Sequence, residues 1–301
     1  MGYAPILLFT YCRKKNTQET IEYLLKNEEA KDSDLFIYSD AAKNEESKEQ
    51  VAEVRSYLYS INGFKSVTII ERKENWGLAK NIISGVTEVV NQFGVVIVLE
   101  DDHSVSPFFL KYMNEALIKY KDNKDIVSIH GYVYPHKTIL PEAFLIKGAD
   151  CWSWATWKDA WALFNPDAGS LYKQIIEKRM QREFNFNNSY PYMRMLKKQS
   201  EGLANSWAIC WYASTFLLNK YTLYPGESMT KLNSLHDSGT HSDKPSKGLL
   251  KYNVELRERP INLDIVDVYG ENLNARKAFE DFFNSLKTFK SRIKHLLSLF
   301  D

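Results

Sequence analysis

Short hydrophobic runs alternate with helical patterns along the first 101 residues. Each run is rich in β-branched or aromatic residues and bounded by polar residues, which is typical of a β-strand. The runs are PILLFTY (5–11), DLFIYSD (34–40), SVTIIER (66–72) and VVIVLED (95–101). Between them, apolar residues recur at helical spacing in NTQETIEYLLKN (16–27), KEQVAEVRSYLYSI (48–61) and LAKNIISGVTEVVNQF (78–93). This alternation predicts an α/β fold with a mainly parallel sheet flanked by helices.

The pattern changes at about residue 150, where aromatic residues become dense. The segment CWSWATWKDAWALFNP (151–166) holds four of the seven tryptophans. Trp154, Trp157 and Trp161 have helical spacing, and we expect at least two of them to pack inward. This half predicts an aromatic-rich lobe built onto the sheet. Further elements are predicted as helices over 173–196 and 205–219, an extended stretch around 261–270 and a final helix from about 272.

Composition and charge narrow the class of protein. At 301 residues, with 44% hydrophobic and 14% aromatic residues, the chain can bury a substantial core. A net charge of +1 is too small to attract nucleic acid to the protein as a whole. Cys12, Cys151 and Cys210 have no metal-ligand spacing, so we expect reduced thiols. The N-terminus lacks a signal-peptide pattern and no uncharged apolar run approaches about 18 residues, so we expect a cytoplasmic protein.

The fourth predicted strand ends in three consecutive acids, Glu100, Asp101 and Asp102. In parallel α/β sheets, ligands bind outside the carboxyl ends of the strands, which is where these side chains emerge. Neighbouring carboxylates repel one another, so a site that keeps them together is typical of one that holds a cation. A helix that starts at Pro107 with Ser106 as its N-cap would explain Ser106 but not the acids. The acids therefore favour a metal or sugar-phosphate site.

Several segments, taken in order, resemble a GT-A glycosyltransferase of the family 2 type. The resemblance covers roughly residues 3–245 and implies a GT-A fold and sugar transfer from a nucleotide donor. LEDDHSVSPFFLKYMNEAL (99–117) is especially similar to the acidic motif of N-acetylglucosaminyltransferase I and its bacterial relatives. The other segments are CRKKNTQETIEYLLKN (12–27), ENWGLAKNIISGV (74–86), CWSWATWKDAW (151–161), NSWAICWYASTF (205–216) and SGTHS (238–242).

The resemblance implies a role for each acid and for the residues around them. In glycosyl transfer, negative charge grows on the diphosphate leaving group, and a divalent cation, Mn²⁺ or Mg²⁺, offsets it. By resemblance, Asp102 is the metal ligand, whereas Glu100 and Asp101 contact the ribose or the donor sugar. Further nucleotide-sugar contacts are implied for Thr10, Arg13, Asp40 and Lys80.

Three of these positions also have a simpler interpretation. Arg13 suits a phosphate or a base edge, but a solvated surface charge would fit the segment CRKKN equally well. Asp40 matches the position where related enzymes hydrogen-bond uracil, which implies a UDP-linked donor, but Asp is also a common turn residue. Gly77 suits a close backbone approach, and Lys80 and Asn81 open a helix near the donor, although this segment would also serve as a plain strand-to-helix connection.

An inverting transferase needs a carboxylate that takes the proton from the acceptor hydroxyl. Family 2 relatives often place this acid in the helix that matches NSWAICW (205–211), where this sequence has none. The remaining candidates are Asp150, Asp159 and Glu201. Asp150 ranks first because it flanks the segment that, by resemblance, lies under the donor sugar.

Sugar contacts and a further metal ligand come from the second half. Aromatic faces bind sugar rings, so Trp152, Ser153 and Trp154 are candidates for contacts to the acceptor or the donor sugar, with core packing as the alternative for the tryptophans. By resemblance, His241, favoured over His236, reaches back to complete the metal shell, unless both histidines lie on a solvated surface loop.

The final segment is basic and amphipathic. Apolar residues recur at helical spacing from Phe279 to Phe300, with lysines and an arginine between them. This helix either docks on the protein's own body or contacts an anionic membrane surface or a partner.

These features together predict an enzyme. We expect residues 1–130 to bind the nucleotide sugar, 131–245 to form the acceptor half of the same domain, and 246–301 to be a C-terminal extension. The expected reaction is the metal-dependent, inverting transfer of a UDP-linked sugar to a glycan or lipid-linked saccharide in bacterial surface polysaccharide, lipopolysaccharide or capsule synthesis. The alternatives are a glycan-binding protein that lost its activity, favoured by the missing helix acid, and a sugar-1-phosphate nucleotidyltransferase, disfavoured because TYCRKKN (10–16) contains no glycine.

Overall fold

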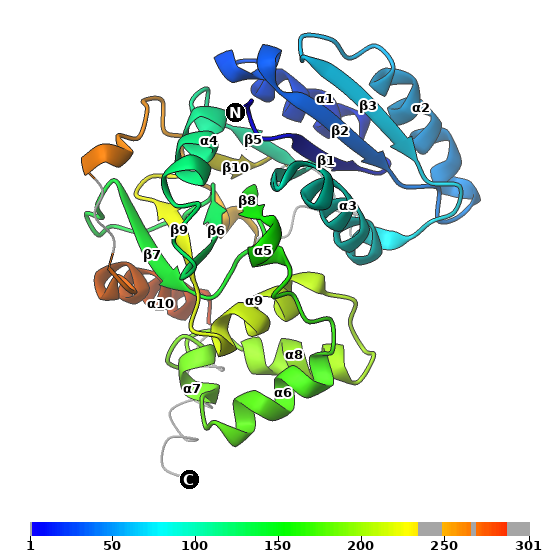
Figure 1. Ribbon diagram of the computed structural model, residues 1–301. Coiled ribbons are helices and arrows are strands. Elements are labelled where there is room, and N and C mark those ends of the chain that lie inside the picture. The colour runs from blue at the N-terminus through cyan, green and yellow to red at the C-terminus, as the bar shows by residue number, and fades with distance from the viewer. Residues whose placement is uncertain (1, 234–248, 266–268, 288–301) are drawn as a thin grey trace.

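The computed structural model describes residues 2–233, 249–265 and 269–287, and its centre is one eight-stranded sheet (Figure 1). Strands β1 to β4, β6 and β9 run in one direction, and β7 and β8 run against them. The sheet is therefore mainly parallel, as predicted. In spatial order its strands are β3 (Ser66–Glu71), β2 (Asp34–Ser39), β1 (Ile6–Thr10), β4 (Val95–Glu100), β8 (Trp154–Trp157), β6 (Ile126–His130), β9 (Tyr221–Pro225) and β7 (Ala143–Lys147).

Alternate residues of the central strands face opposite sides of the sheet, as the period of a strand requires. Ile6 and Leu8 pack on one side, whereas Leu7 and Phe9 pack on the other. Because both sides are apolar, both must be covered. The first side is covered by α1 (Lys14–Leu24), α2 (Lys48–Leu58) and α4 (Phe109–Lys119), and the second by α3 (Gly77–Phe93) and α9 (Trp207–Leu217).

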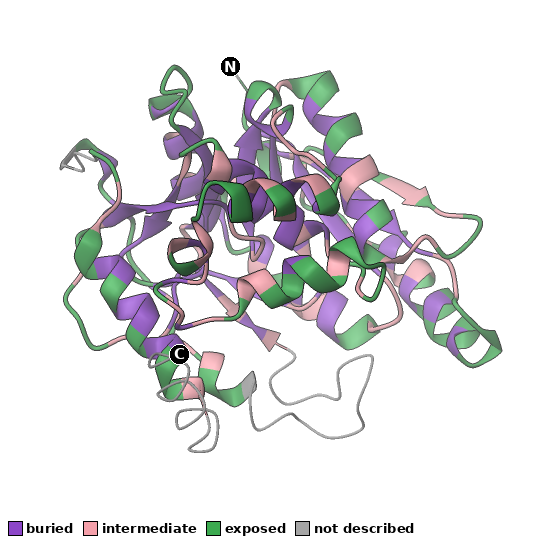
Figure 2. Cartoon of the chain, turned by 90° about the horizontal axis from the view of Figure 1, so that it is seen from below, coloured by how far each residue is buried: buried purple, intermediate pink, exposed green. Residues whose placement is uncertain are grey.

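The second half adds the predicted lobe, with a separate aromatic core. Phe184, Tyr212 and Phe216 are buried there together with Phe279 and Phe283. Figure 2 shows buried strands inside a shell of helices whose outer faces are exposed. The helices of the lobe, besides α9, are α6 (Ala168–Glu177), α7 (Gln181–Phe184), α8 (Tyr192–Ser200) and α10 (Leu273–Leu286). The remaining elements are β5 (His103–Val105), which pairs with β10 (Thr230–Leu232), α5 (Lys158–Trp161), and the 3-10 turns Glu28–Asp32, Glu45–Ser47, Leu249–Tyr252 and Leu263–Ile265.

The four predicted strands and the three helices between them are confirmed, but the tryptophan segment differs. Trp154–Trp157 forms a strand instead of a helix, because it pairs with β4 on one side and β6 on the other. Trp154, Trp157 and Trp161 nevertheless pack inward, as expected.

The other differences have local causes. The helix predicted over 173–196 is three shorter helices, since Arg179 and residues 186–188 adopt positive φ angles, which end a helix. Helix α4 begins at Phe109 instead of Pro107, and Ser106 Oγ accepts from the Phe108 N–H at 3.2 Å. Around 261–270, the described residues contain a 3-10 turn instead of an extended stretch.

The final helix, α10, packs against the body of the protein over its described part. Over the described part of the final helix, Phe279, Phe282 and Phe283 are buried in the lobe's own core. Residues 288–301 lie outside the described residues. Among the helices that the structure describes, none combines the length and the apolar character needed to span a bilayer.

Candidate active site

The three acids lie at the carboxyl end of β4, where the sequence predicts them. Asp101 and Asp102 form the turn between β4 and β5, which we call the acid turn, residues 100–102. Arg13, which follows the neighbouring strand β1, reaches across to it. Its Nη2 lies 2.6 Å from Asp101 Oδ1, and its Nη1 lies 3.1 Å from Asp102 Oδ2. The guanidinium therefore bridges two of the three acids, and Arg13 is not a solvated surface charge.

The acid turn concentrates negative charge in a sheltered place. Burial and the charges of Asp102 and Asp101 raise the pKa of Glu100 to about 8. Burial also raises the pKa of Asp101, although Arg13 opposes this and the Tyr11 N–H donates to Asp101 Oδ2 at 3.2 Å. Burial disfavours the charge on Arg13, but the two aspartates outweigh it and hold its pKa above the ordinary value. Such a site gains from any added cation.

The donor atoms at the acid turn suit a hard divalent cation. Carboxylate oxygens are the ligands that Mg²⁺ and similar ions take, commonly one or two from the protein with the rest from substrate phosphates and water. Asp101 and Asp102 fit that pattern. The described residues contain no cluster of three or more His, Cys, Asp or Glu side chains that would hold a metal by itself. His236 and His241 lie outside the described residues.

The other predicted nucleotide contacts lie along the same edge of the sheet. Thr10 ends β1, and its buried Oγ1 has no hydrogen-bond partner among the described residues. Lys80 Nζ lies 3.9 Å from the ring centroid of Trp76. An unpartnered hydroxyl and a lysine near the strand ends leave polar groups for a ligand.

Asp40 has a structural role at the end of β2, and its predicted contact to the nucleotide stays a prediction. Its Oδ1 accepts from the N–H groups of Ala41 and Trp76, both at 2.9 Å, and its Oδ2 accepts from the Gly77 N–H at 2.8 Å and from Asn75 Nδ2 at 3.2 Å. Gly77 has φ +70, a conformation that favours glycine. Asp40 therefore fixes the loop that begins α3, beside the edge where the acids lie.

A short segment links the acid turn to the second half. Ser153 Oγ lies 3.0 Å from Nδ1 of His103, which follows the acids directly. Ser153 is buried with φ 49, and its carbonyl accepts from the Gly131 N–H at 2.7 Å. A Cβ at Gly131 would lie 2.8 Å from that carbonyl oxygen, so this position requires glycine. A strained, buried serine held from both sides is typical of a functional segment.

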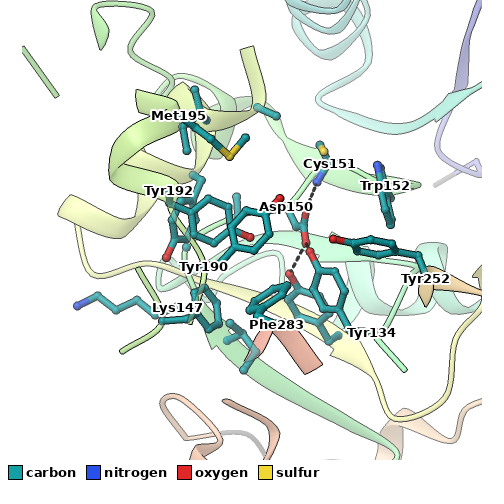
Figure 3. Close-up of a pocket in the computed structure, with 18 residues that line it drawn as sticks. Tyr134, Lys147, Asp150, Cys151, Trp152, Tyr190, Tyr192, Met195, Tyr252 and Phe283 are labelled. Carbon is teal, nitrogen blue, oxygen red and sulfur yellow. Dashed lines mark hydrogen bonds between the residues drawn. The ribbon is translucent and has the colours of Figure 1, made fainter. Parts of the chain in front are cut away.

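Beyond Ser153 lies a pocket of about 300 Å³, which we call the aromatic pocket (Figure 3). Asp150 lies at its centre. Its Oδ2 accepts from the hydroxyls of Tyr134 at 2.8 Å and Tyr224 at 3.2 Å, and its Oδ1 accepts from the Cys151 N–H at 2.8 Å. Other aromatic residues that line the pocket are Trp152, Phe186, Tyr190, Tyr192, Tyr212, Tyr252 and Phe283.

The pocket and the acid turn are neighbours. Burial, then the charges of Asp150 and Glu100, raise the pKa of the Cys151 thiol, so Cys151 is influenced by carboxylates of both sites. His130 fixes the segment between them: its Nε2 accepts from the Trp152 N–H at 3.0 Å, and its Nδ1 lies 2.7 Å from the Tyr132 carbonyl oxygen. A sugar held between the sites would meet groups from each.

Two of the three candidate bases lie elsewhere. Asp159 follows Trp157, which pairs with Val95 at the start of β4, whereas Glu100 ends β4, about 17 Å away along the strand. Asp159 pairs with Lys124 there. Glu201 lies at the C-terminus of α8, where its Oε1 is 3.6 Å from Lys197 Nζ. The structure therefore brings only Asp150, among these three, into the aromatic pocket.

Of the predicted sugar contacts, Trp152 lines the pocket, but Trp154 does not. Trp154 is buried in a cluster with Trp161, Trp207 and Trp211, which is the core-packing alternative. The tyrosines around Asp150 were not predicted. They come from strands, loops and helices far apart in the sequence, and only their abundance, 18 tyrosines in the chain, could have indicated them.

Comparison with known proteins identifies the sheet half. The model of the family "Glycosyl transferase family 2" matches residues 6–144, from the start of β1 into β7. This match confirms the resemblance over residues 6–144, the part of the chain that is similar to the family 2 glycosyltransferases. The particular similarity to N-acetylglucosaminyltransferase I stays a prediction. No curated protein matches the sequence.

Several solved structures are similar to the chain, among them a mannosyltransferase, TarS and a pyrophosphorylase. A mannosyltransferase from Pyrobaculum calidifontis, in complex with GDP-Man and Mn²⁺, has 12% identity and a TM-score of 0.33, over 44% of this chain and 36% of its own. S. aureus TarS 1–349 has 13% identity and a TM-score of 0.43, over 78% and 61%. UDP-glucose pyrophosphorylase complexed with UDP-glucose has 13% identity and a TM-score of 0.37, over 74% of this chain and 90% of its own. The chain thus spans less than two thirds of the first two, and these scores are too low to add to the family match.

Proposed function

We propose that this protein, whose residues 6–144 form a family 2 glycosyltransferase domain, transfers a sugar from a nucleotide donor to a glycan acceptor. The observation that carries the proposal is the adjacency of two carboxylate sites: the acid turn, suited to a metal and a diphosphate, and the aromatic pocket with Asp150, suited to a sugar. Residues 1–130 serve the donor, residues 131–245 serve the acceptor, and both contribute strands to one sheet.

The donor diphosphate would bind at the acid turn. Asp102, with Asp101 beside it, would hold the Mn²⁺ or Mg²⁺, and the ion would offset the charge that grows on the leaving diphosphate. Thr10, Arg13 and Lys80 line the same edge and supply further polar contacts to the nucleotide.

The acceptor would enter the aromatic pocket. Pyranose C–H groups pack flat against aromatic faces, and Trp152 and the tyrosines offer several. Oδ2 of Asp150 already accepts two tyrosine hydroxyls, whereas Oδ1 accepts one backbone N–H, so Oδ1 is the atom with capacity for the acceptor proton. Asp150 therefore replaces the carboxylate that α9 lacks, and a separate base and leaving diphosphate imply inversion.

The donor is proposed to carry uridine. The support is Asp40, which lies at the end of β2 and orders the loop before α3. Calorimetric titration should give tighter binding of UDP than of GDP or CMP. Equal affinity for all three would refute the uridine assignment and leave the transfer reaction standing.

The acceptor is proposed to belong to bacterial surface polysaccharide, lipopolysaccharide or capsule, reached from the inner face of the membrane. The basic end of the chain, 288–301, would supply contact with anionic lipid. A truncation should stop after Lys287, because removal of α10 would uncover buried phenylalanines. Sedimentation with anionic vesicles should fall in this truncation, and unchanged sedimentation would refute the contact.

The reaction itself can be tested without the acceptor. The full chain, incubated with Mn²⁺ and a panel of nucleotide sugars, should slowly hydrolyse one donor, because water replaces the acceptor. Nucleotide-sugar binding without hydrolysis or transfer would favour the binding-protein alternative. Formation of a nucleotide sugar from a nucleoside triphosphate and a sugar 1-phosphate would favour the nucleotidyltransferase instead.

A further inference from the structure

One oxygen of each aspartate that a metal would use at the acid turn already contacts Arg13. Its two terminal nitrogens contact Asp101 Oδ1 at 2.6 Å and Asp102 Oδ2 at 3.1 Å, so one guanidinium spans both carboxylates. We infer that Arg13 closes the metal site until a diphosphate draws the guanidinium away, so that the metal binds tightly only with the nucleotide. This inference rests on the proposed function, since it concerns the same donor site.

Competition between Arg13 and a metal follows from the contacts of the two aspartates. Asp101 Oδ2 accepts from the Tyr11 N–H, and Oδ1 accepts from Arg13. Asp102 Oδ2 accepts from Arg13, and its Oδ1 lies 3.6 Å from Nε2 of His103. A guanidinium fork and a divalent cation at these two carboxylates repel each other, because both carry positive charge. A metal that binds both acids therefore competes with Arg13.

The mobile partner in this contact is the arginine. The side chain of Arg13 is 24% exposed, whereas those of Asp101 and Asp102 are 5% and 18% exposed. A long side chain that is partly exposed can move with less loss of packing than a buried one, while the aspartates belong to a short turn between two strands. Arg13 can thus swing outward, and the carboxylates stay in place.

A diphosphate is the ligand that would draw Arg13 away. The guanidinium fork matches phosphate oxygens as well as carboxylate oxygens, and a nucleoside diphosphate brings more than one negative charge to the same edge. Once Arg13 contacts the diphosphate, Asp101 and Asp102 lose the positive charge of its guanidinium and attract the metal more strongly. By linkage, nucleotide and metal then raise each other's affinity by the same factor.

Mn²⁺ binding without nucleotide tests this directly. The loss of the free-Mn²⁺ electron paramagnetic resonance signal should be titrated in the wild type, Arg13→Gln, Arg13→Lys and the control Arg259→Gln, whose arginine pairs with Glu227 instead. Arg13→Gln should bind Mn²⁺ about tenfold more tightly than wild type or more. Arg13→Lys keeps the charge but cannot bridge both acids, so its affinity should lie between the two. Arg259→Gln should match the wild type.

A second arm adds UDP. In the wild type UDP should tighten Mn²⁺ binding about tenfold or more, and in Arg13→Gln it should tighten it far less. Adding Asp102→Asn to Arg13→Gln should abolish the gained affinity, which places the ion at the acid turn. Thermal unfolding of each variant checks that it folds, and Arg13→Lys serves if Arg13→Gln does not.

The outcomes separate this inference from the proposed function. If Arg13→Gln and Arg13→Lys bind Mn²⁺ no more tightly than wild type, Arg13 does not close the site, whatever the enzyme does with donors. If the wild type hydrolyses a nucleotide sugar with Mn²⁺ but binds Mn²⁺ equally well without UDP, the inference fails and the function stands. If the Arg13 variants gain Mn²⁺ as expected and no donor is hydrolysed, the inference stands and the function fails.

Discussion

The acid turn and the aromatic pocket both centre on carboxylates, but they hold them in different ways. At the acid turn the acids are adjacent in sequence and a guanidinium balances two of them. In the pocket, Asp150 is held by two tyrosine hydroxyls and a backbone N–H, all neutral donors. A carboxylate that is paired with one cation can exchange it for another, whereas a carboxylate held by neutral donors can still receive a proton. Under the proposed function, this difference suits the first site to a metal and a diphosphate and the second to proton transfer.

Removing a metal ligand should have the largest effect. Asp102→Asn keeps the shape of the acid turn but removes the charge that the proposed metal would use, so Mn²⁺-dependent turnover should fall about 10³-fold. Calorimetry should show that Mn²⁺ no longer strengthens UDP binding. If this variant keeps metal-dependent turnover, the acid turn does not hold the metal.

Loss of the proposed base should lower turnover less than loss of the metal ligand, and it should leave nucleotide binding unchanged. Asp150→Asn should lower turnover about 10²-fold and leave UDP affinity nearly intact, because the pocket holds the acceptor and not the nucleotide. Asp159→Asn is the matched control at the opposite edge of the sheet and should remain close to wild type. Near-normal turnover in Asp150→Asn would move the base to Glu201 or to residues outside the described ranges.

The tyrosine hydroxyls give a finer comparison within the pocket. Tyr224→Phe removes one of the two hydroxyls on Asp150 Oδ2 and should lower turnover about tenfold, as expected for a lost hydrogen bond to a charged group. In the Asp150→Asn background the same change should have little further effect, since both act through one carboxylate. Additive losses in the double variant would show that Tyr224 acts independently of Asp150.

The smallest expected effect concerns stability and pH. Burial lowers the pKa of His130 below its ordinary value of 6.5, so the unfolded chain takes up a proton at a pH where the folded chain does not. Stability from this group is therefore present above pH 6.5 and is lost as the pH falls below that value.

His130→Gln tests the assignment, since a glutamine oxygen can still accept from the Trp152 N–H. The decrease in melting temperature from pH 7 to pH 5.5 should be smaller in this variant than in wild type. Carboxylates that titrate in that range affect both proteins alike. Equal decreases would mean that His130 is protonated as readily in the folded state as in the unfolded chain.

The two sites also differ in how far the sequence could predict them. The acid turn could be predicted because a short apolar run and the acids at its end are local, contiguous features, and the same holds for strands β1 to β4 and helices α1 to α3. The aromatic pocket could not, because Tyr134 and Tyr224 meet Asp150 only when β9 joins the sheet beside β6 and β7.

The tryptophan segment shows why spacing alone misleads in the second half. Positions 154, 157 and 161 fit a helix on one face, but a strand buried on both faces also carries large apolar residues at every position. Pairing with β4 and β6 makes this segment a strand and not a helix, and nothing in the sequence of Trp154–Trp157 indicates these partner strands. The same limit explains why Asp159 was a candidate base: its distance from the acids depends on the direction of β8.

The most direct test of the account is the metal dependence of donor breakdown in the purified full chain. Release of the free nucleotide from a panel of nucleotide sugars should be followed with Mn²⁺, with a chelator, and in Asp102→Asn and Asp159→Asn. The account predicts release from one donor that requires Mn²⁺, disappears in Asp102→Asn and persists in Asp159→Asn. Two results would contradict it: release that survives both the chelator and the Asp102→Asn change, or no release from any nucleotide sugar of the panel.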